Sequence, residues 1–307
     1  MTTLRKETRS CAVCGLTEAH EALVSSSQLG VPDLDLRPPP PLRGALSSFV
    51  QSCSRCGYAA PAIDQLLKDA GRWVRTPEYR AVLSDEAYPP VARRFLAAAF
   101  LEERAKEAGN AALSCLRAAW ICDDLGAIDA ARTARKRAVL LFRAARASGL
   151  AVLGPSEELA VIADLLRRAG DFEASVQASR EGMILTQDER LVSILEFQRH
   201  KAQAQDTGVY RLDQVEAEDT TNPTIDDALA TLGDPIGVAV PIDDQRVAIR
   251  LNVEARVRRA TDLVLGGPGG ENVRVRVESV TSPDRVIAGI ISGAISGAGP
   301  WMVFRGR

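Results

Sequence analysis

Hydrophobic and polar positions follow two different periods along the chain. Between residues 129 and 146, apolar side chains fall on one side of a helix and basic ones on the other. From Val247 to Val257, apolar residues alternate with mostly polar ones, and VRVRV at 273–277 does the same. The first period predicts an amphipathic helix that packs against its neighbours, and the second predicts two half-buried strands.

The middle of the chain, from about residue 62 to 205, has the composition of helices. It is rich in Ala, Leu, Arg and Glu and has few internal prolines. PAIDQLLKDAGRWV (61–74) and PPVARRFLAAAFLEERAKEAGN (89–110) each begin at proline, which suits the first turn of a helix. We expect the second of these helices to stop at Gly109 and Asn110.

A helix pair is expected from residue 154 to 185, with Ser156 capping the first helix. Thr186 and Glu189 have the spacing of a capping box for a last long helix. LLRRAGDFEASVQ within the pair has the rhythm of a tetratricopeptide helix-turn-helix, with its turn at Gly170. Residues 118–145 repeat this rhythm more loosely, so we expect degenerate tetratricopeptide-like repeats.

The last hundred residues have a different character. Residues 207–236 are acidic and turn-rich, which predicts a linker, and residues 237–307 predict a β-rich region. GGPGG at 266–270 lacks the Gly-Lys-Ser/Thr ending of a phosphate-binding loop. Residues 286–304 carry no charge and are long enough to cross a bilayer. Their Gly, Ser, Ala and Pro content favours strands and turns over a membrane anchor.

Two short cysteine hooks offer the clearest chemistry. Cys11 and Cys14 form CAVCG, and Cys53 and Cys56 form CSRCG. Four thiolates complete the tetrahedral shell that zinc prefers, and a glycine after each hook permits the positive φ of a tight turn. A complete shell leaves no position for a substrate, which predicts a structural zinc ion. The alternative is a redox motif of thioredoxin type, which the duplication of the hook disfavours.

The bulk composition matches a soluble globular protein. Of 307 residues, 46% are hydrophobic and 25% charged, and the formal net charge is −2, so no global positive field favours nucleic acid or anionic lipid. No apolar run follows the first basic residues, so we expect no secretory signal and a cytoplasmic location. In a reducing compartment the six cysteines are not a disulfide framework, and Cys115 and Cys122 are expected to be buried.

Several of these stretches together resemble a known bacterial family. CAVCG, DLDLRP at 33–38, CSRCGYAA at 53–60 and LRAAW at 116–120 are similar to the domain-of-unknown-function (DUF) 2225 family. The likeness covers about residues 8 to 205. It implies a two-hook cysteine domain followed by tetratricopeptide-like helices, without an assigned activity. The proline run PPPPLRG at 38–44 and the C-terminal hundred residues depart from the family's pattern.

One helix face carries a row of cations, which we call the basic stripe. It consists of Arg132, Arg135, Lys136, Arg143 and Arg146. These residues fall within about one third of a helical turn, and no acidic residue lies between Asp129 and Glu157. The stripe could bind an acidic peptide, a phosphate group or RNA. The alternative, which we favour, is a solvated face paired with carboxylates of the adjacent repeat.

These observations predict a multidomain α+β protein. We expect a zinc-ribbon-like domain at 1–61, an all-α tetratricopeptide-like domain at 62–206, a linker at 207–236 and a β-rich region at 237–307. The sequence contains no recognisable catalytic constellation, so we expect a non-enzymatic scaffold or adaptor that binds a protein or peptide. The alternative is a nucleic-acid-binding zinc-ribbon regulator, but residues 1–60 carry six Lys/Arg against five Asp/Glu and are not basic. A membrane partner and a small-molecule substrate are not expected.

Overall fold

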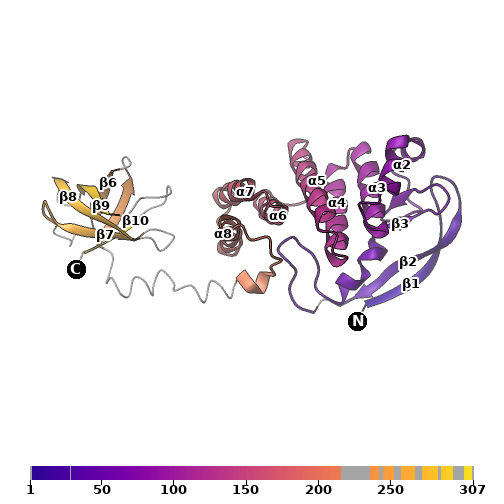
Figure 1. Ribbon diagram of the computed structural model, residues 1–307, viewed down its shortest axis with the longest axis horizontal. Coiled ribbons are helices and arrows are strands. Elements are labelled where there is room, and N and C mark those ends of the chain that lie inside the picture. The colour runs from indigo at the N-terminus through magenta and orange to yellow at the C-terminus, as the bar shows by residue number, and fades with distance from the viewer. Residues whose placement is uncertain are drawn as a thin grey trace. The chain divides into compact units, whose positions relative to one another are not determined.

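The computed structural model describes residues 2–27, 29–215, 236–241, 245–251, 257–266, 272–282, 285–292 and 301–305. These residues form a mixed α+β protein with two compact units, Met1–Ala217 and Glu218–Arg307 (Figure 1). The first unit holds the cysteine hooks and the helices. The second is built from strands.

Each cysteine hook lies at the end of an antiparallel hairpin. Strands β1 (Thr2–Ser10) and β2 (Thr17–Ser26) form a two-stranded ribbon whose last pair is Ser10 with Thr17, so the first hook fills the turn. Strands β3 (Gln51–Ser52) and β4 (Ala59–Ala60) pair in the same way around the second hook. The helix η1 (Leu42–Phe49) lies between the two hairpins in the sequence. The ribbon of β1 and β2 was not expected, because apolar and polar residue types do not alternate along TTLRKETRS and TEAHEALVSS.

The helices expected between residues 62 and 205 are present as a series of separate elements. Helices α1 to α8 run over Ala70–Trp73, Pro77–Ser84, Pro90–Arg104, Ala108–Asp124, Ile128–Ala147, Pro155–Arg168, Phe172–Leu185 and Glu189–Gln203. Sequence neighbours such as α4 and α5, or α6 and α7, pack against each other (Figure 1). The turn between α6 and α7 contains Gly170 at φ 81°, where the sequence predicted it.

Two predicted helix boundaries are wrong. Residues 61–69 are turns and not helix. Their backbone binds the hook region instead, because Tyr58 Oη accepts from Leu67 N and the Gln51 side chain accepts from Ile63 N. Gly109 lies inside α4 and does not end α3; a Cβ there would lie 2.5 Å from Val152 Cγ1, so the glycine allows a close approach.

Two predicted helix caps are also wrong. Helix α6 has Gly154 as its N-cap residue, and the hydroxyl of Ser156 contacts the side chain of the next residue. Helix α8 is capped by Asp188, whose carboxylate accepts from the backbone of Arg190 and Leu191. Thr186 lies two residues before this N-cap residue, and its hydroxyl accepts a hydrogen bond from Asp188 N.

The hooks and the helices share one hydrophobic core. Cys11, Tyr58 and Ile63 from the hook region are buried in the same cluster as Phe95 of α3 and Leu116 of α4. Residues 1–61, expected to be a separate domain, therefore belong to the same compact unit as the helices that follow. Shared burial means that the hooks and the helices stabilise each other.

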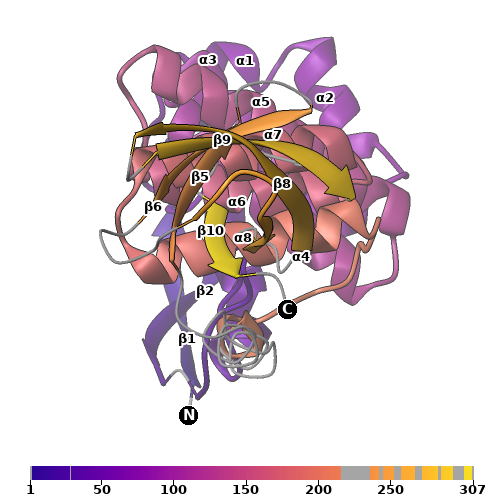
Figure 2. The same ribbon diagram turned by 90° about the vertical axis from the view of Figure 1, so that its left-hand side faces the viewer.

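The second unit is a closed six-stranded barrel. Its strands are β5 (Gly237–Pro241), β6 (Arg246–Leu251), β7 (Asp262–Gly266), β8 (Asn272–Ser282), β9 (Arg285–Ser292) and β10 (Trp301–Arg305). They follow the order β10-β5-β6-β9-β8-β7 around the barrel, and every neighbouring pair is antiparallel. Figure 2 shows these strands curving around a common interior.

The barrel confirms part of the predicted strand pattern. Val247, Ile249 and Leu251 of β6 point inward, as do Val273 and Val275 of β8. Strand β7 was not expected between these two segments; it closes the barrel by pairing with both β8 and β10.

The predicted strand at 247–257 is shorter in the structure. Its β6 part ends at Leu251, residues 252–256 lie outside the described residues, and Val257 is outside any strand. The strands expected within 286–304 are confirmed for β9 and for the part of β10 that falls there; residues 293–300 lie outside the described part.

In the described residues, no helix combines the length and apolar character needed to span a bilayer. The linker expected at 207–236 falls mostly outside the described residues, and the GGPGG loop does so from residue 267 on.

Candidate metal centre and its buried anchor

The two hooks have the same backbone hydrogen bonds. In the first hook, Gly15 N donates to Cys11 O at 2.8 Å and Cys11 N donates to Leu16 O at 2.8 Å. In the second, Gly57 N donates to Cys53 O at 2.9 Å and Cys53 N donates to Tyr58 O at 2.8 Å. Gly15 and Gly57 adopt φ 72° and 74°, which glycine reaches without strain. Two equivalent turns therefore present their paired sulfurs in the same way.

The four sulfur atoms of the hooks form one cluster. Cys11 Sγ lies 3.6 Å from Cys56 Sγ, and Cys14 Sγ lies 3.5 Å from Cys53 Sγ. All four sulfurs lie within 4.8 Å of one another. A tetrahedral ion with zinc–sulfur bonds of about 2.3 Å requires sulfurs about 3.8 Å apart, whereas a disulfide requires about 2.05 Å. The cluster can thus hold a metal ion, and its donors are compatible with zinc.

The backbone around the first hook, rather than the pKa values of its thiols, differs from that of a redox pair. A backbone hydrogen bond from Leu16 is the main cause that lowers the pKa of Cys14 to about 7. Burial raises the pKa of Cys11 and of Cys56. A thioredoxin-type motif requires a helix that starts at its first cysteine, whereas the first hook lies in a turn. The geometry favours a closed metal cage.

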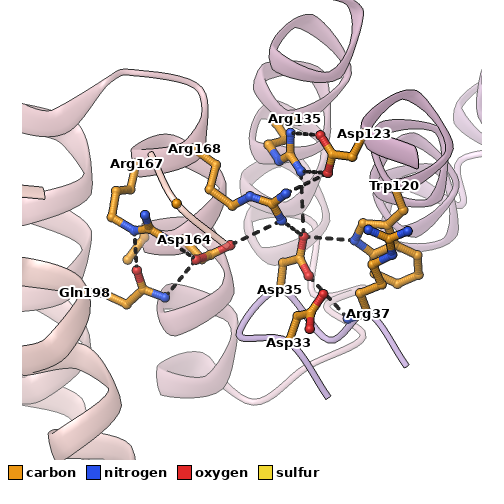
Figure 3. A network of polar contacts seen from close by, with 12 residues as sticks. Asp33, Asp35, Arg37, Trp120, Asp123, Arg135, Asp164, Arg167, Arg168 and Gln198 are labelled. Atoms are coloured by element: carbon orange, nitrogen blue, oxygen red, sulfur yellow. Dashed lines mark hydrogen bonds and ion pairs between the residues drawn. The ribbon is translucent and has the colours of Figure 1, made fainter. Parts of the chain in front are cut away.

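A buried anchor holds the segment between the hooks against the helices. Its centre is Asp35, which has no exposed surface. Asp35 Oδ2 accepts from Trp120 Nε1 of α4 at 2.9 Å and from Arg168 Nη1 of α6 at 2.5 Å (Figure 3). Arg135 Nη2 of α5 lies 3.9 Å from the same oxygen. One carboxylate thus contacts three successive helices of the series α4 to α6.

Further charged residues extend this anchor on both sides. Arg168 Nη2 also donates to Asp123 Oδ2 at 2.6 Å, and Arg135 forms two hydrogen bonds with Asp123 (Figure 3). On the other side, Arg167 Nη2 donates to Asp164 Oδ1 at 2.6 Å, and Gln198 Nε2 donates to the same oxygen at 2.9 Å. The helices α4, α5, α6 and α8 are therefore joined by one polar network.

The backbone of the inserted segment completes the anchor. Leu34 N donates to Tyr210 O at 2.9 Å, and Asp33 forms an isolated β-bridge with Arg211. The Leu34 side chain packs with Phe197 of α8 and with Val215. Except for the exposed Leu36, the segment from Asp33 to Arg37 is thus buried between the helices and the chain that follows α8.

Electrostatics explain why this network must be complete. Burial raises the pKa of Asp35, and the guanidinium of Arg168 opposes this rise. Burial lowers the pKa of Arg168, but the carboxylates of Asp35, Asp164 and Asp123 together raise it above its ordinary value. Because cations and carboxylates alternate through the network, each buried charge has an opposite neighbour. Removing one member leaves an uncompensated charge in a region of low dielectric constant.

The residues of the basic stripe differ in burial and in pairing with carboxylates. Arg135 has 2% of its surface exposed and Arg146 Nε donates to Glu158 Oε1 at 2.9 Å, so both are paired with carboxylates of neighbouring helices. Arg132, Lys136 and Arg143 are exposed. The stripe is therefore not one continuous binding face, and Arg135 is unavailable to a partner.

The buried anchor was not predicted from the sequence, although two signals for it were present. The first is in α6, where Asp164 interrupts the apolar stretch LAVIADLL and Arg167 and Arg168 end it, since charged residues are costly there unless paired. The second signal was the acidic DLDLRP segment, whose partners no local pattern identifies. Cys115 and Cys122 are buried, as expected. Trp120 is buried too, and its ring nitrogen serves the anchor.

Comparison with models of protein families, with curated proteins and with solved structures found no match for this chain.

Proposed function

We propose that this protein is a non-enzymatic, zinc-stabilised scaffold whose tetratricopeptide-like helices bind a protein or peptide partner. The supporting observation is that the segment joining the two hooks is clamped to α4, α5 and α6 through Asp35. A closed four-sulfur cage offers no open coordination position for a substrate, so its contribution is to stabilise the fold. This arrangement of hooks and paired helices is also what the likeness to the DUF2225 family implies.

The partner in this proposal is an acidic segment of another protein. Arg132, Lys136 and Arg143 are exposed on α5 and carry positive charge to the surface. The chain itself provides a precedent, because its helices already hold the acidic segment around Asp35 through Arg168 and Arg135. Exposed cations steer and orient an acidic partner more than they add affinity.

Affinity capture with matched variants tests this proposal. The wild-type chain is compared with R132A/K136A/R143A and with R137A. The cation of Arg137 lies on the same helix but pairs with Glu103 of α3, whereas Arg132 pairs with Asp129 of its own helix. We expect one set of proteins to be retained by the wild type and by R137A and lost with the triple variant. Equal retention by all three chains would exclude the exposed cations of α5 as the partner surface. If the wild type retains no protein specifically, the scaffold proposal fails.

The alternative function is nucleic-acid binding through the same exposed cations. The internal pairing of Arg135 and Arg146 leaves fewer cations for phosphates, which is why we rank this function second. A gel shift with bulk RNA and DNA at increasing salt tests it, because phosphate contacts weaken steeply as salt rises. Retardation at low salt that disappears in R132A/K136A/R143A would favour this alternative. No retardation at low salt removes it.

A further inference from the structure

A cavity lies between the hook region and the helices. It has a volume of about 490 Å³ and is lined on one side by residues 60–67 and on the other by α3, α4 and the turn between them. Tyr58 shapes the first wall, since its hydroxyl donates to Gln65 O at 2.5 Å and accepts from Leu67 N at 3.0 Å. The volume lies within the range of pockets that bind small organic molecules.

Glu102 is a buried carboxyl group on the wall of this cavity. Only 3% of its surface is exposed, and its Oε2 atom has no hydrogen-bond partner among the described residues. Burial is the main cause that raises its pKa to about 7; the Ser114 hydroxyl and Arg117 oppose the rise, while Glu107 adds to it. A buried polar atom without a partner costs about 1–3 kcal/mol, so such an atom beside a cavity indicates a missing donor.

None of the other polar side chains that line the cavity, Gln65 included, donates a hydrogen bond to Glu102 Oε2 in the described residues. The Arg117 guanidinium lies over the Phe49 ring, 5.8 Å from its centroid. Asn110 Nδ2 donates to Glu107 Oε2 at 3.0 Å, so this pair satisfies itself at the rim. Among the described residues, the hook cysteines are the only group of metal-ligating side chains close enough to share an ion. A metal ion therefore does not suit the cavity.

The remaining lining defines the ligand. Leu66, Leu67 and Leu113 supply apolar surface, and Leu66 is 61% exposed, so it gains from being covered. The two carboxyl groups outnumber the single guanidinium, so the lining disfavours an anion. We propose that this cavity binds a primary ammonium group on an apolar body, with the ammonium facing the carboxyl group of Glu102. Such a group belongs either to a free aliphatic amine or to a lysine side chain of a peptide.

Calorimetric titration of the full-length, zinc-loaded protein tests this proposal. The probe is hexylamine, and the neutral control ligand is hexanol. We expect saturable hexylamine binding that weakens at least about tenfold in E102Q, because a hydrogen bond to a charged group contributes about 1.5–3 kcal/mol. Hexanol should bind at least about tenfold more weakly than hexylamine for the same reason. The matched variant E107Q, at the self-satisfied rim, should change affinity less than about threefold.

A second variant keeps the test valid if E102Q is unstable. L66A changes an exposed residue and should weaken hexylamine binding by about two- to fivefold through lost apolar contact. Absence of saturable binding, equal affinity for hexanol, or wild-type affinity in both E102Q and L66A would overturn the proposal.

An acetylated Leu-Lys amide peptide identifies the source of the ammonium group: tighter binding than hexylamine indicates a peptide lysine, and weaker binding indicates a free amine. The cavity lies apart from the exposed cations of α5, so this result does not depend on the proposed scaffold function.

Discussion

The indole nitrogen of Trp120 donates a hydrogen bond of 2.9 Å to the carboxylate of Asp35, although 85 residues separate the two in the sequence. Asp35 lies between the two cysteine hooks, and Trp120 lies in the helix α4. This bond and the neighbouring ion pairs tie the loop that joins the hooks to the helical part of the protein. The hooks, the loop and the helices should therefore unfold together.

Replacing Asp35 should destabilise the first unit strongly. D35N removes the charge that Arg168 and Arg135 face while keeping the side chain's shape. We expect a loss of about 3–5 kcal/mol in the free energy of unfolding, because two buried guanidinium groups lose a common partner. D129N is the control, since Asp129 pairs with the exposed Arg132 and is itself 96% exposed; its loss should stay below about 1 kcal/mol. Urea titrations measure both values, and equal losses would contradict a buried anchor.

The four hook cysteines should bind about one zinc ion per chain. Protein purified without chelator should contain this zinc by elemental analysis, and C11S/C56S should lose it. C115S/C122S changes two other buried cysteines and should keep the metal. Chelation of the wild-type chain should lower its melting temperature, because metal binding is coupled to folding. Metal-free wild-type protein, or metal retained in C11S/C56S, would refute the assigned ligands.

Stability should fall as Glu102 ionises. Its pKa is about 7 in the folded protein against an ordinary 4.5, so the unfolded chain ionises first as the pH rises. The folded state should lose about 3 kcal/mol between these two pH values and no more above them. E102Q lacks this ionisation. Urea titrations from pH 4.5 to 8 should show E102Q becoming more stable than the wild type as pH rises; parallel curves would contradict the raised pKa.

Two glycines of the helices should respond in opposite ways to alanine. At Gly109 of α4, a Cβ would lie 2.5 Å from Val152 Cγ1 and 3.0 Å from Leu150 O. G109A should therefore cost about 1–3 kcal/mol through overpacking. At Gly71 of α1 a Cβ meets nothing within 4 Å, so G71A should stabilise by about 0.5–1 kcal/mol. Thermal unfolding checks both, and a neutral G109A would contradict the close approach.

Local features of the chain were predictable because they depend on residues close in sequence. The hook spacing and the following glycines predicted a four-sulfur cluster, since a tight turn needs only a few residues. Gly170 marked the turn between α6 and α7 for the same reason. The alternation in β6 and β8 predicted strands because one face of each is buried.

Tertiary structure decided the features that depend on distant partners. Residues 61–69 have helical composition, yet their backbone groups bind Tyr58 and Gln51, and these bonds replace those of a helix. Arg135 belongs to a basic helix face by sequence, but Asp123 and Asp35 draw it into the interior. The sequence alone thus determined the paired cysteine hooks and the helical and strand periods, whose causes lie within a few residues. Only the folded chain decided which charges are buried, because an ion buried away from water is stable only beside a partner, and here that partner comes from another part of the chain.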